Sequence, residues 1–136
     1  MRVVLDTNVI ISGLLWKKNT KALFDLVDKK QIKICLSPKI ITEILRVLKY
    51  PHIKKQLDLI KLSPNEIISY LKQISEIYPD IKIAINLSDS SDRIFLGVAV
   101  KSKAKYLVSG DKHLLSLKQF QGIKILMPKE FLKEIK

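Results

Sequence analysis

Two aspartates stand at the ends of short apolar runs of the kind that form buried strands. Asp6 follows the run VVL directly, and Asp111 follows the run YLV after Ser109 and Gly110. Short, β-branched runs closed by polar turns predict strands of an α/β sheet. In such a sheet ligands bind outside the carboxyl ends of the strands. We therefore predict that the two carboxylates converge at one edge of a sheet.

Two further acids extend this set. Asp92 lies in the first turn of a helix predicted over residues 89–103, and Glu43 lies in a helix predicted over residues 37–48. Glu43 borders the apolar stripe of its helix, so we expect its side chain to be partly buried. Together the four acids predict one carboxylate cluster.

Each acid has a structural alternative, which the sequence leaves open. Asp92 has capping-box spacing from Asp89, and Asp111 suits an Asx turn. Glu43 has possible ion-pair partners one turn away on both sides, which are Lys39 and Arg46. Asp6 is the hardest to explain structurally, because an acid directly after a buried first strand has little evident structural purpose.

The chemistry of such a cluster points to a divalent cation. Crowded carboxylates raise one another's pKa unless a cation neutralises them. Oxygen ligands favour Mg²⁺ or Mn²⁺, and His52 and His113 are too far apart in the sequence to indicate a zinc site. In a basic protein, a hard cation suits hydrolysis of a phosphodiester by an activated water. No Ser, Cys or His stands beside a plausible base, so we expect no covalent intermediate.

Composition restricts the class of protein. The 136 residues carry 25 Lys and Arg against 13 Asp and Glu, which gives a net charge of +12 and favours a polyanionic partner, either nucleic acid or a membrane surface. The length suits a single domain, residues 1–136. We expect no membrane span and no signal peptide. The single cysteine, Cys35, is typical of a reducing compartment, so we predict a cytoplasmic protein.

The pattern along the chain predicts an α/β fold, a three-layer α/β/α sandwich with a mostly parallel, roughly five-stranded sheet. Ser37-Pro38 and the capping box Ser63–Glu66 are predicted to start two of its helices. The predicted strands are residues 2–5, 32–36, 81–85, 106–109 and 124–126. The predicted helices are residues 9–15, 22–27, 37–48, 52–62, 63–77, 89–103 and a last one from residue 128.

The motifs VVLDTNVIISGLL, ITEIL, DSSDRIFLGVAV and KYLVSGDKHLL, with the ending GIKILMPKEFL, resemble the PIN-domain ribonucleases. The most similar branch comprises toxin components of prokaryotic toxin–antitoxin pairs. The resemblance implies a PIN-like fold and cleavage of single-stranded or structured RNA with Mg²⁺ or Mn²⁺. It also implies an antitoxin partner and a homodimer or higher homo-oligomer. The residues it implies are the catalytic acids Asp6, Glu43, Asp92 and Asp111, of which Asp6, Asp92 and Asp111 bind metal, with Asn8, Ser12 and Ser109 as polar neighbours.

Four positions depart from the family pattern. Ser90 and Arg93 stand where similar sequences have Pro and Asn, and Gly97 and His113 stand where an acid is common. Arg93 instead suits contact with a phosphate. A groove wall that binds RNA is predicted from the basic residues after the Glu43 helix, which are Lys49, Lys54, Lys55 and Lys61.

Two other functions remain open at this point. In one, the acid cluster is degenerate and the chain is a nucleic-acid-binding module without turnover. In the other, Asp6 is the acid of a phosphotransfer domain. Aspartyl-phosphate phosphatases usually carry a second acid two residues later, where this chain has Asn8, and receiver domains carry paired acids that VVLDTN lacks.

Overall fold

The computed structural model describes residues 1–15, 18–85 and 92–135 of the chain. Its centre is a six-stranded sheet in the order β3-β2-β1-β4-β6-β5. All neighbouring strands run parallel except β5, which pairs antiparallel with β6. The strands are β1 (Arg2–Leu5), β2 (Lys33–Leu36), β3 (Ser75–Ile77), β4 (Tyr106–Val108), β5 (Gln119–Phe120) and β6 (Ile123–Leu126).

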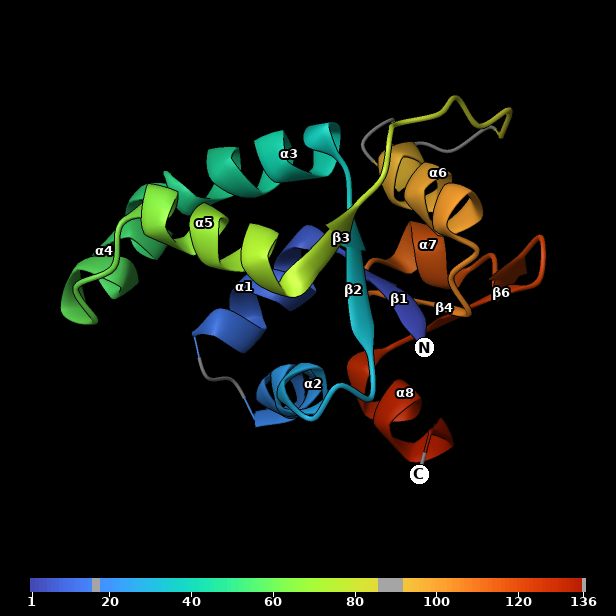
Figure 1. Ribbon diagram of the computed structural model, residues 1–136, viewed down its shortest axis with the longest axis horizontal. Helices are drawn as coiled ribbons and strands as arrows, with labels where there is room; N and C mark the ends of the chain where they lie inside the picture. The colour runs from blue at the N-terminus through green and yellow to red at the C-terminus, as the bar shows by residue number, and fades with distance from the viewer. Residues whose placement is uncertain (16–17, 86–91, 136) are drawn as a thin grey trace.

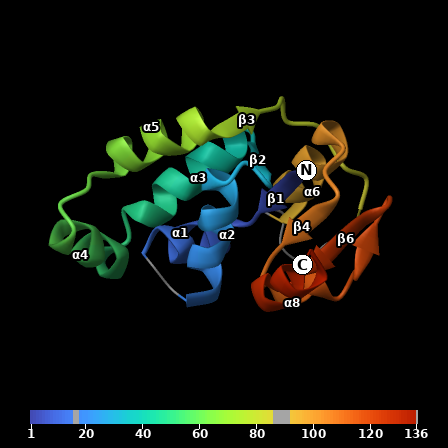
Figure 2. The same ribbon diagram turned by 60° about the horizontal axis from the view of Figure 1, so that its bottom comes forward.

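Helices flank the sheet on both sides, as Figures 1 and 2 show. Helix α6 packs against β1, β2 and β4, while α1, α3 and α5 lie together on the other side of β2. This arrangement confirms the predicted α/β class with a mostly parallel sheet. The helices are α1 (Thr7–Leu14), α2 (Lys18–Asp28), α3 (Pro38–Leu48), α4 (Pro51–Leu59), α5 (Pro64–Ile74), α6 (Asp92–Ser102), α7 (Lys112–Leu115) and α8 (Pro128–Glu134).

The hydrophobic core lies between these layers. The side chains of Val3, Val4 and Leu5 are fully buried, as expected for a central parallel strand covered on both faces. Leu96 on α6 and Ile44 on α3 are fully buried as well. No helix in the described part of the chain has the length and apolar character that a membrane span needs.

Two helix starts follow the predicted capping chemistry. The backbone N–H of Ile40 donates to Ser37 Oγ at 3.2 Å, and Pro38 occupies the first turn of α3. At α5, Glu66 N–H donates to Ser63 Oγ at 3.1 Å, and Ser63 N–H donates to Glu66 Oε1 at 3.0 Å. These caps fix where the chain turns away from the sheet.

The predicted strand at residues 81–85 is wrong, and so is the predicted end of the helix at residues 63–77. Helix α5 ends at Ile74, and residues 75–77 form the edge strand β3 beside β2. The backbone N–H of Tyr78 extends this pairing by donating to Leu36 O at 2.8 Å. The extended segment 81–85 instead runs past α6, where the carbonyl oxygen of Ile81 would lie 2.9 Å from a Cβ atom added at Gly97.

Two smaller differences concern the carboxyl-terminal half. Strand β6 pairs with the short strand β5 through a turn at Gln121 (φ 49°) and Gly122 (φ 83°). Only β6 corresponds to a strand predicted from the sequence. Gly122 is suited to this turn because glycine adopts positive φ without steric cost. Asp89, the predicted helix cap, and Ser90, which departs from the family pattern, lie outside the described residues.

Candidate active site

A cleft of about 330 Å³ lies at the carboxyl ends of β1 and β4. All four predicted catalytic acids line it, although they come from four separate segments of the chain. Asp6 follows β1, Asp111 follows β4, Asp92 begins α6, and Glu43 lies in the middle of α3. The parallel topology thus brings the two strand ends together, and two helices complete the cleft.

Asp6 is held at the end of β1 by three hydrogen bonds. Its backbone N–H donates to Val108 O at 3.0 Å, which places it next to the end of β4. Its Oδ1 accepts the N–H of Val9 at 2.9 Å and caps α1, while its Oδ2 accepts the hydroxyl of Ser109. The expectation that Asp6 has little structural purpose is therefore wrong, because it starts α1 in addition to lining the cleft.

The charge on Asp6 is costly in this environment. The side chain is 6% exposed, and burial raises the pKa of its carboxyl above the ordinary value of 3.8. The hydrogen bonds from Ser109 and Val9 lower this pKa, and the negative charge of Asp111 raises it further. A nearby cation would offset both unfavourable contributions by stabilising the ionised carboxylate.

Asp111 also combines a structural contact with its position in the cleft. Its Oδ1 accepts the backbone N–H groups of His113 (2.8 Å) and Leu114 (3.3 Å), which caps the short helix α7. Its own N–H donates to Ser109 Oγ at 2.9 Å. The structural alternative for Asp111 is therefore observed, and it leaves the side chain at the cleft. Ser109 connects the two acids, since its oxygen contacts both.

Glu43 is paired with Arg46 on the same helix. Arg46 Nε lies 2.9 Å from Glu43 Oε1, and the Glu43 side chain is 17% exposed, as expected for a partly buried residue. The guanidinium also contacts the Tyr50 hydroxyl and lies 5.4 Å from the centroid of the Tyr50 ring. The ion-pair alternative for Glu43 is thus present, and the pair faces the cleft.

The predicted polar neighbours are placed differently from one another. Asn8 lines the cleft, and Ser109 contacts Asp6. The hydroxyl of Ser12 lies 2.9 Å from the hydroxyl of Thr20, a contact between α1 and α2. Ser12 is not among the described residues that line the cleft.

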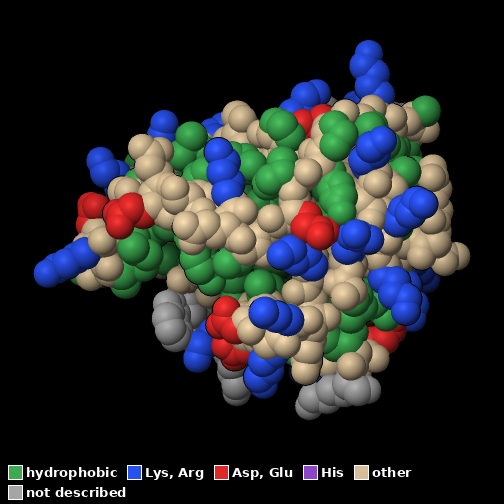
Figure 3. Space-filling model, viewed as in Figure 1, with side chains coloured by type: hydrophobic (Ala, Val, Ile, Leu, Met, Phe, Trp, Pro, Cys, Tyr) green, Lys and Arg blue, Asp and Glu red, His purple; other side chains and the backbone are tan. Residues whose placement is uncertain are grey.

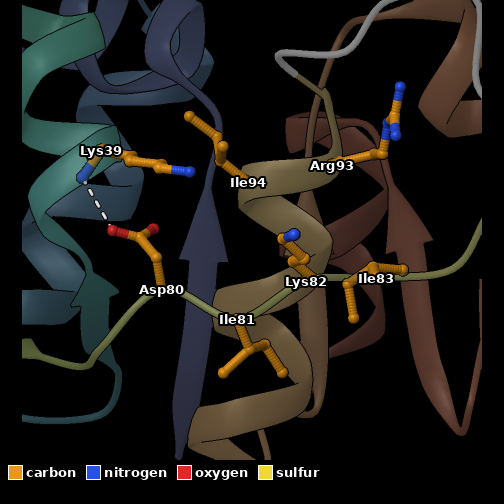
Figure 4. Close-up of a pocket in the computed structure, with 7 residues that line it drawn as sticks. All are labelled: Lys39, Asp80, Ile81, Lys82, Ile83, Arg93 and Ile94. Atoms are coloured by element: carbon orange, nitrogen blue, oxygen red, sulfur yellow. Dashed lines mark hydrogen bonds between the residues drawn. The ribbon is translucent and has the colours of Figure 1, made fainter.

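The predicted RNA-binding cations lie outside the cleft in the described part of the structure. Lys49, Lys54, Lys55 and Lys61 are exposed at the end of α3 and along and beyond α4. Figure 3 shows that Lys and Arg side chains are spread over the face it draws instead of forming one patch. Arg93 lines a neighbouring pocket of about 370 Å³ together with Lys39, Asp80 and Lys82. In Figure 4 it extends away from Asp80, which accepts the backbone N–H of Lys39 at 3.0 Å.

Several residues of the cleft were not predicted from the sequence. Among them, Arg46, Tyr50 and His52 line it from α3 and the start of α4. A signal for them existed in the sequence. Arg46 follows Glu43 by three residues and so shares its helix face, and the tripeptide Tyr50-Pro51-His52 places two aromatic rings where a proline ends one helix and starts the next.

The donor set of the cleft fits a hard divalent cation. Its candidate ligands are carboxylates with oxygen donors, as Mg²⁺ and Mn²⁺ prefer. The four acids line one cleft, but no three His, Cys, Asp or Glu side chains in the described ranges are arranged to hold one metal ion. Two effects keep the carboxylates apart when no cation is bound. The carboxylates repel one another, and the ion pair with Arg46 holds Glu43.

Comparison with known proteins identifies the family. Residues 2–113, a span that includes all four acids, match the PIN domain family. The chain belongs to the PIN domain family. This assignment decides against a phosphotransfer domain.

A solved structure agrees with this PIN fold. The chain superimposes on a chain of VapBC2 from Rickettsia felis with a TM-score of 0.58 and 14% sequence identity. That crystal structure shows VapBC2 bound to a DNA fragment from its promoter. The superposition covers 92% of this PIN chain and 97% of that chain. No curated protein matches the sequence.

Proposed function

We propose that this PIN domain protein is a metal-dependent endoribonuclease of the cytoplasm, with Asp6, Asp92 and Asp111 as ligands of Mg²⁺ or Mn²⁺. The observation that carries the proposal is the meeting of four acids from four chain segments in one cleft of a protein with net charge +12. A bound divalent cation supplies an activated water and positive charge for phosphodiester hydrolysis. Glu43, on the α3 side of the cleft, completes the catalytic acids.

The chain's own residues prepare this site. Ser109 and the Val9 amide favour the ionised form of Asp6, which is the form that binds a cation. Asp111 is oriented by the amides at the start of α7, and Asp92 is 5% exposed at the start of α6. The three aspartates are therefore carried by the ends of strands and helices, which limits their movement.

The proposal is tested by incubating purified protein with labelled single-stranded RNA in Mg²⁺, in Mn²⁺ and in EDTA. Cleavage in either metal, its absence in EDTA and its loss in Asp6→Asn and Asp111→Asn support the proposal. Cleavage of equal rate in the variants would contradict it, because a contaminating nuclease would then be responsible. Ser116→Ala, at the exposed C-cap of α7, is a control that should cleave at the rate of the wild type.

The second candidate function is a PIN-like module that binds nucleic acid without cleaving it. It is favoured by the Glu43–Arg46 ion pair and by the lack of a ready three-residue metal site among the described side chains. Binding of RNA without cleavage in either metal, on every RNA tested, would favour this module over the enzyme.

We further propose that the protein acts as the toxin of a toxin–antitoxin pair and forms a homodimer or higher homo-oligomer. The structural likeness to a VapBC2 chain supports the first part. Exposed apolar side chains at and after α4, Leu59, Ile60 and Leu62, support self-association. A short neighbouring reading frame whose product relieves growth arrest would support the pairing, and light scattering would measure the oligomeric state.

A further inference from the structure

The elbow between α3 and α4 presents two aromatic rings to the acid cleft. Tyr50 and His52 stand on either side of Pro51, and both line the cleft that contains the four acids. Their ring centroids are 6.1 Å apart with an interplanar angle of 36°. Tyr50 is 37% exposed and His52 is exposed, so neither ring belongs to the hydrophobic core. The cleft wall therefore offers aromatic surface to a ligand.

Local helix chemistry does not explain the tyrosine. Tyr50 occupies the N-cap position of α4 and makes no side-chain capping hydrogen bond. Ser, Thr, Asp and Asn are preferred at this position because their side chains accept an orphan backbone N–H. A residue that departs from a local preference without a capping benefit marks a candidate functional position.

A cation stands beside the rings. Arg46 contacts the Tyr50 hydroxyl and lies 5.4 Å from the ring centroid, so its guanidinium sits toward the hydroxyl end of the ring. Arg46 also pairs with Glu43, which connects the aromatic wall to the acids. The exposed Lys49 and Lys54 flank the elbow in the sequence. Aromatic rings interleaved with cations are the pattern by which proteins hold single-stranded nucleic acid.

We infer that Tyr50 and His52 form a base-stacking subsite for an unpaired nucleotide, with Arg46 contacting an adjacent phosphate of the RNA. This inference rests on the proposed function and specifies how the substrate enters the cleft. A base inside a duplex has both faces covered by its neighbours, whereas an unpaired base can stack on a protein ring. The subsite therefore selects single-stranded segments next to the bond that is cut.

The test is a binding measurement in EDTA, where the proposed reaction cannot proceed. Fluorescence anisotropy gives the Kd of a short labelled single-stranded RNA for the wild type, Tyr50→Ala, Tyr50→Phe and His52→Ala. Tyr50→Ala should weaken binding by about 5- to 150-fold, the range for loss of one stacked base. Tyr50→Phe should retain most of the affinity, because the ring remains. His52→Ala should weaken binding as well.

Tyr70→Ala is the matched control, since Tyr70 on α5 is 39% exposed and lines other pockets than the acid cleft. It should bind as the wild type does. The wild type should bind RNA with abasic sites weakly, because no base can stack. Tyr50→Ala should bind this RNA with nearly the same affinity as the wild type. Unchanged melting temperatures of the variants show that they remain folded.

Three outcomes would overturn the inference. Tyr50→Ala could bind RNA as tightly as the wild type, or Tyr70→Ala could lose as much affinity as Tyr50→Ala. The wild type could also bind duplex RNA as tightly as the single strand. A cleavage assay in Mg²⁺ and Mn²⁺ separates it from the proposed function. Tyr50-dependent binding without cleavage supports the subsite and contradicts the enzyme. If the wild type cleaves RNA, and Tyr50→Ala changes neither the cleavage rate nor the affinity for RNA, the enzyme is supported and the subsite is overturned.

Discussion

The hydroxyl of Ser109, at the end of β4, donates a hydrogen bond to Oδ2 of Asp6, at the end of the neighbouring strand β1. The same hydroxyl oxygen accepts the backbone N–H of Asp111 at 2.9 Å. Ser109 is fully buried, so these contacts form away from solvent. One serine therefore orients two of the proposed metal ligands.

Replacing Ser109 by Ala should weaken metal binding. Loss of its hydrogen bond raises the pKa of Asp6 further and frees the carboxylate to turn, and loss of an outer hydrogen bond to a metal ligand typically costs about 10- to 100-fold in affinity or activity. The measurement is a titration of RNA cleavage with Mn²⁺. Ser116→Ala is the control, because Ser116 is an exposed serine that bonds to the carbonyl of His113. An unchanged Mn²⁺ midpoint for Ser109→Ala would contradict this role.

Asp6→Asn should stabilise the metal-free protein at neutral pH. Asn can still cap α1, and it removes a buried charge whose pKa is raised by burial and by Asp111. A raised pKa in the folded state means that ionisation of Asp6 favours unfolding. The stability of the wild type relative to Asp6→Asn should therefore fall as the pH rises above 3.8, the ordinary pKa.

Thermal unfolding in EDTA at several pH values measures this effect. We expect the variant to melt about 2–6 °C higher at pH ~7, the shift for roughly 1 kcal/mol, and the difference to shrink toward pH ~3.5. A variant that melts well below the wild type at neutral pH would show that the carboxylate contributes net stability through its hydrogen bonds.

Gly97→Ala should destabilise the fold. The added Cβ would lie 2.9 Å from the backbone oxygen of Ile81, a rigid neighbour, and overpacking of this kind costs about 1–3 kcal/mol. Urea unfolding measures the cost. Gly110→Ala is the matched control, since an added Cβ there meets no atom within 4 Å among the described residues. Equal stability of Gly97→Ala and Gly110→Ala would show that the segment 81–85 does not pack on α6 in this way.

Arg46→Ala should weaken RNA binding and reduce its salt dependence. Arg46 lines the acid cleft, and each phosphate of a single strand that the protein no longer neutralises changes the slope of log K against log salt by about 0.7. The slope is measured in EDTA over a series of salt concentrations. Lys133→Ala, an exposed cation on α8, is the control. An identical slope for Arg46→Ala and wild type would contradict an interaction between Arg46 and a phosphate.

Much of the fold follows from local sequence patterns. Buried apolar runs predict β1, β2 and β4, and the caps Ser37 and Ser63 predict where α3 and α5 begin. The meeting of Asp6 and Asp111 in one cleft follows from parallel topology, since residues after neighbouring parallel strands meet at one edge of the sheet. These features depend on short-range chemistry or on a general rule of sheets.

The features that were not predicted depend on tertiary contacts. The segment 81–85 has an apolar alternation typical of a strand, but its backbone runs past Gly97 of α6 while residues 75–77 pair with β2. The spacing of Glu43 and Arg46 indicates their ion pair in the sequence, but only the folded chain places that pair beside Asp6 and Asp111 in one cleft. Local periodicity reveals neither the path of segment 81–85 nor this position at the cleft.

The chemical ends left by RNA cleavage test the central claim most directly. Single-stranded RNA is incubated with the protein in Mn²⁺, and the product ends are identified by mass spectrometry. Attack by water with the acids of the cleft in place predicts a 5′-phosphate and a 3′-hydroxyl, with no product in EDTA. A 2′,3′-cyclic phosphate, or cleavage that persists in EDTA, would contradict the account, because the ribose hydroxyl or a metal-independent group would then be the attacker.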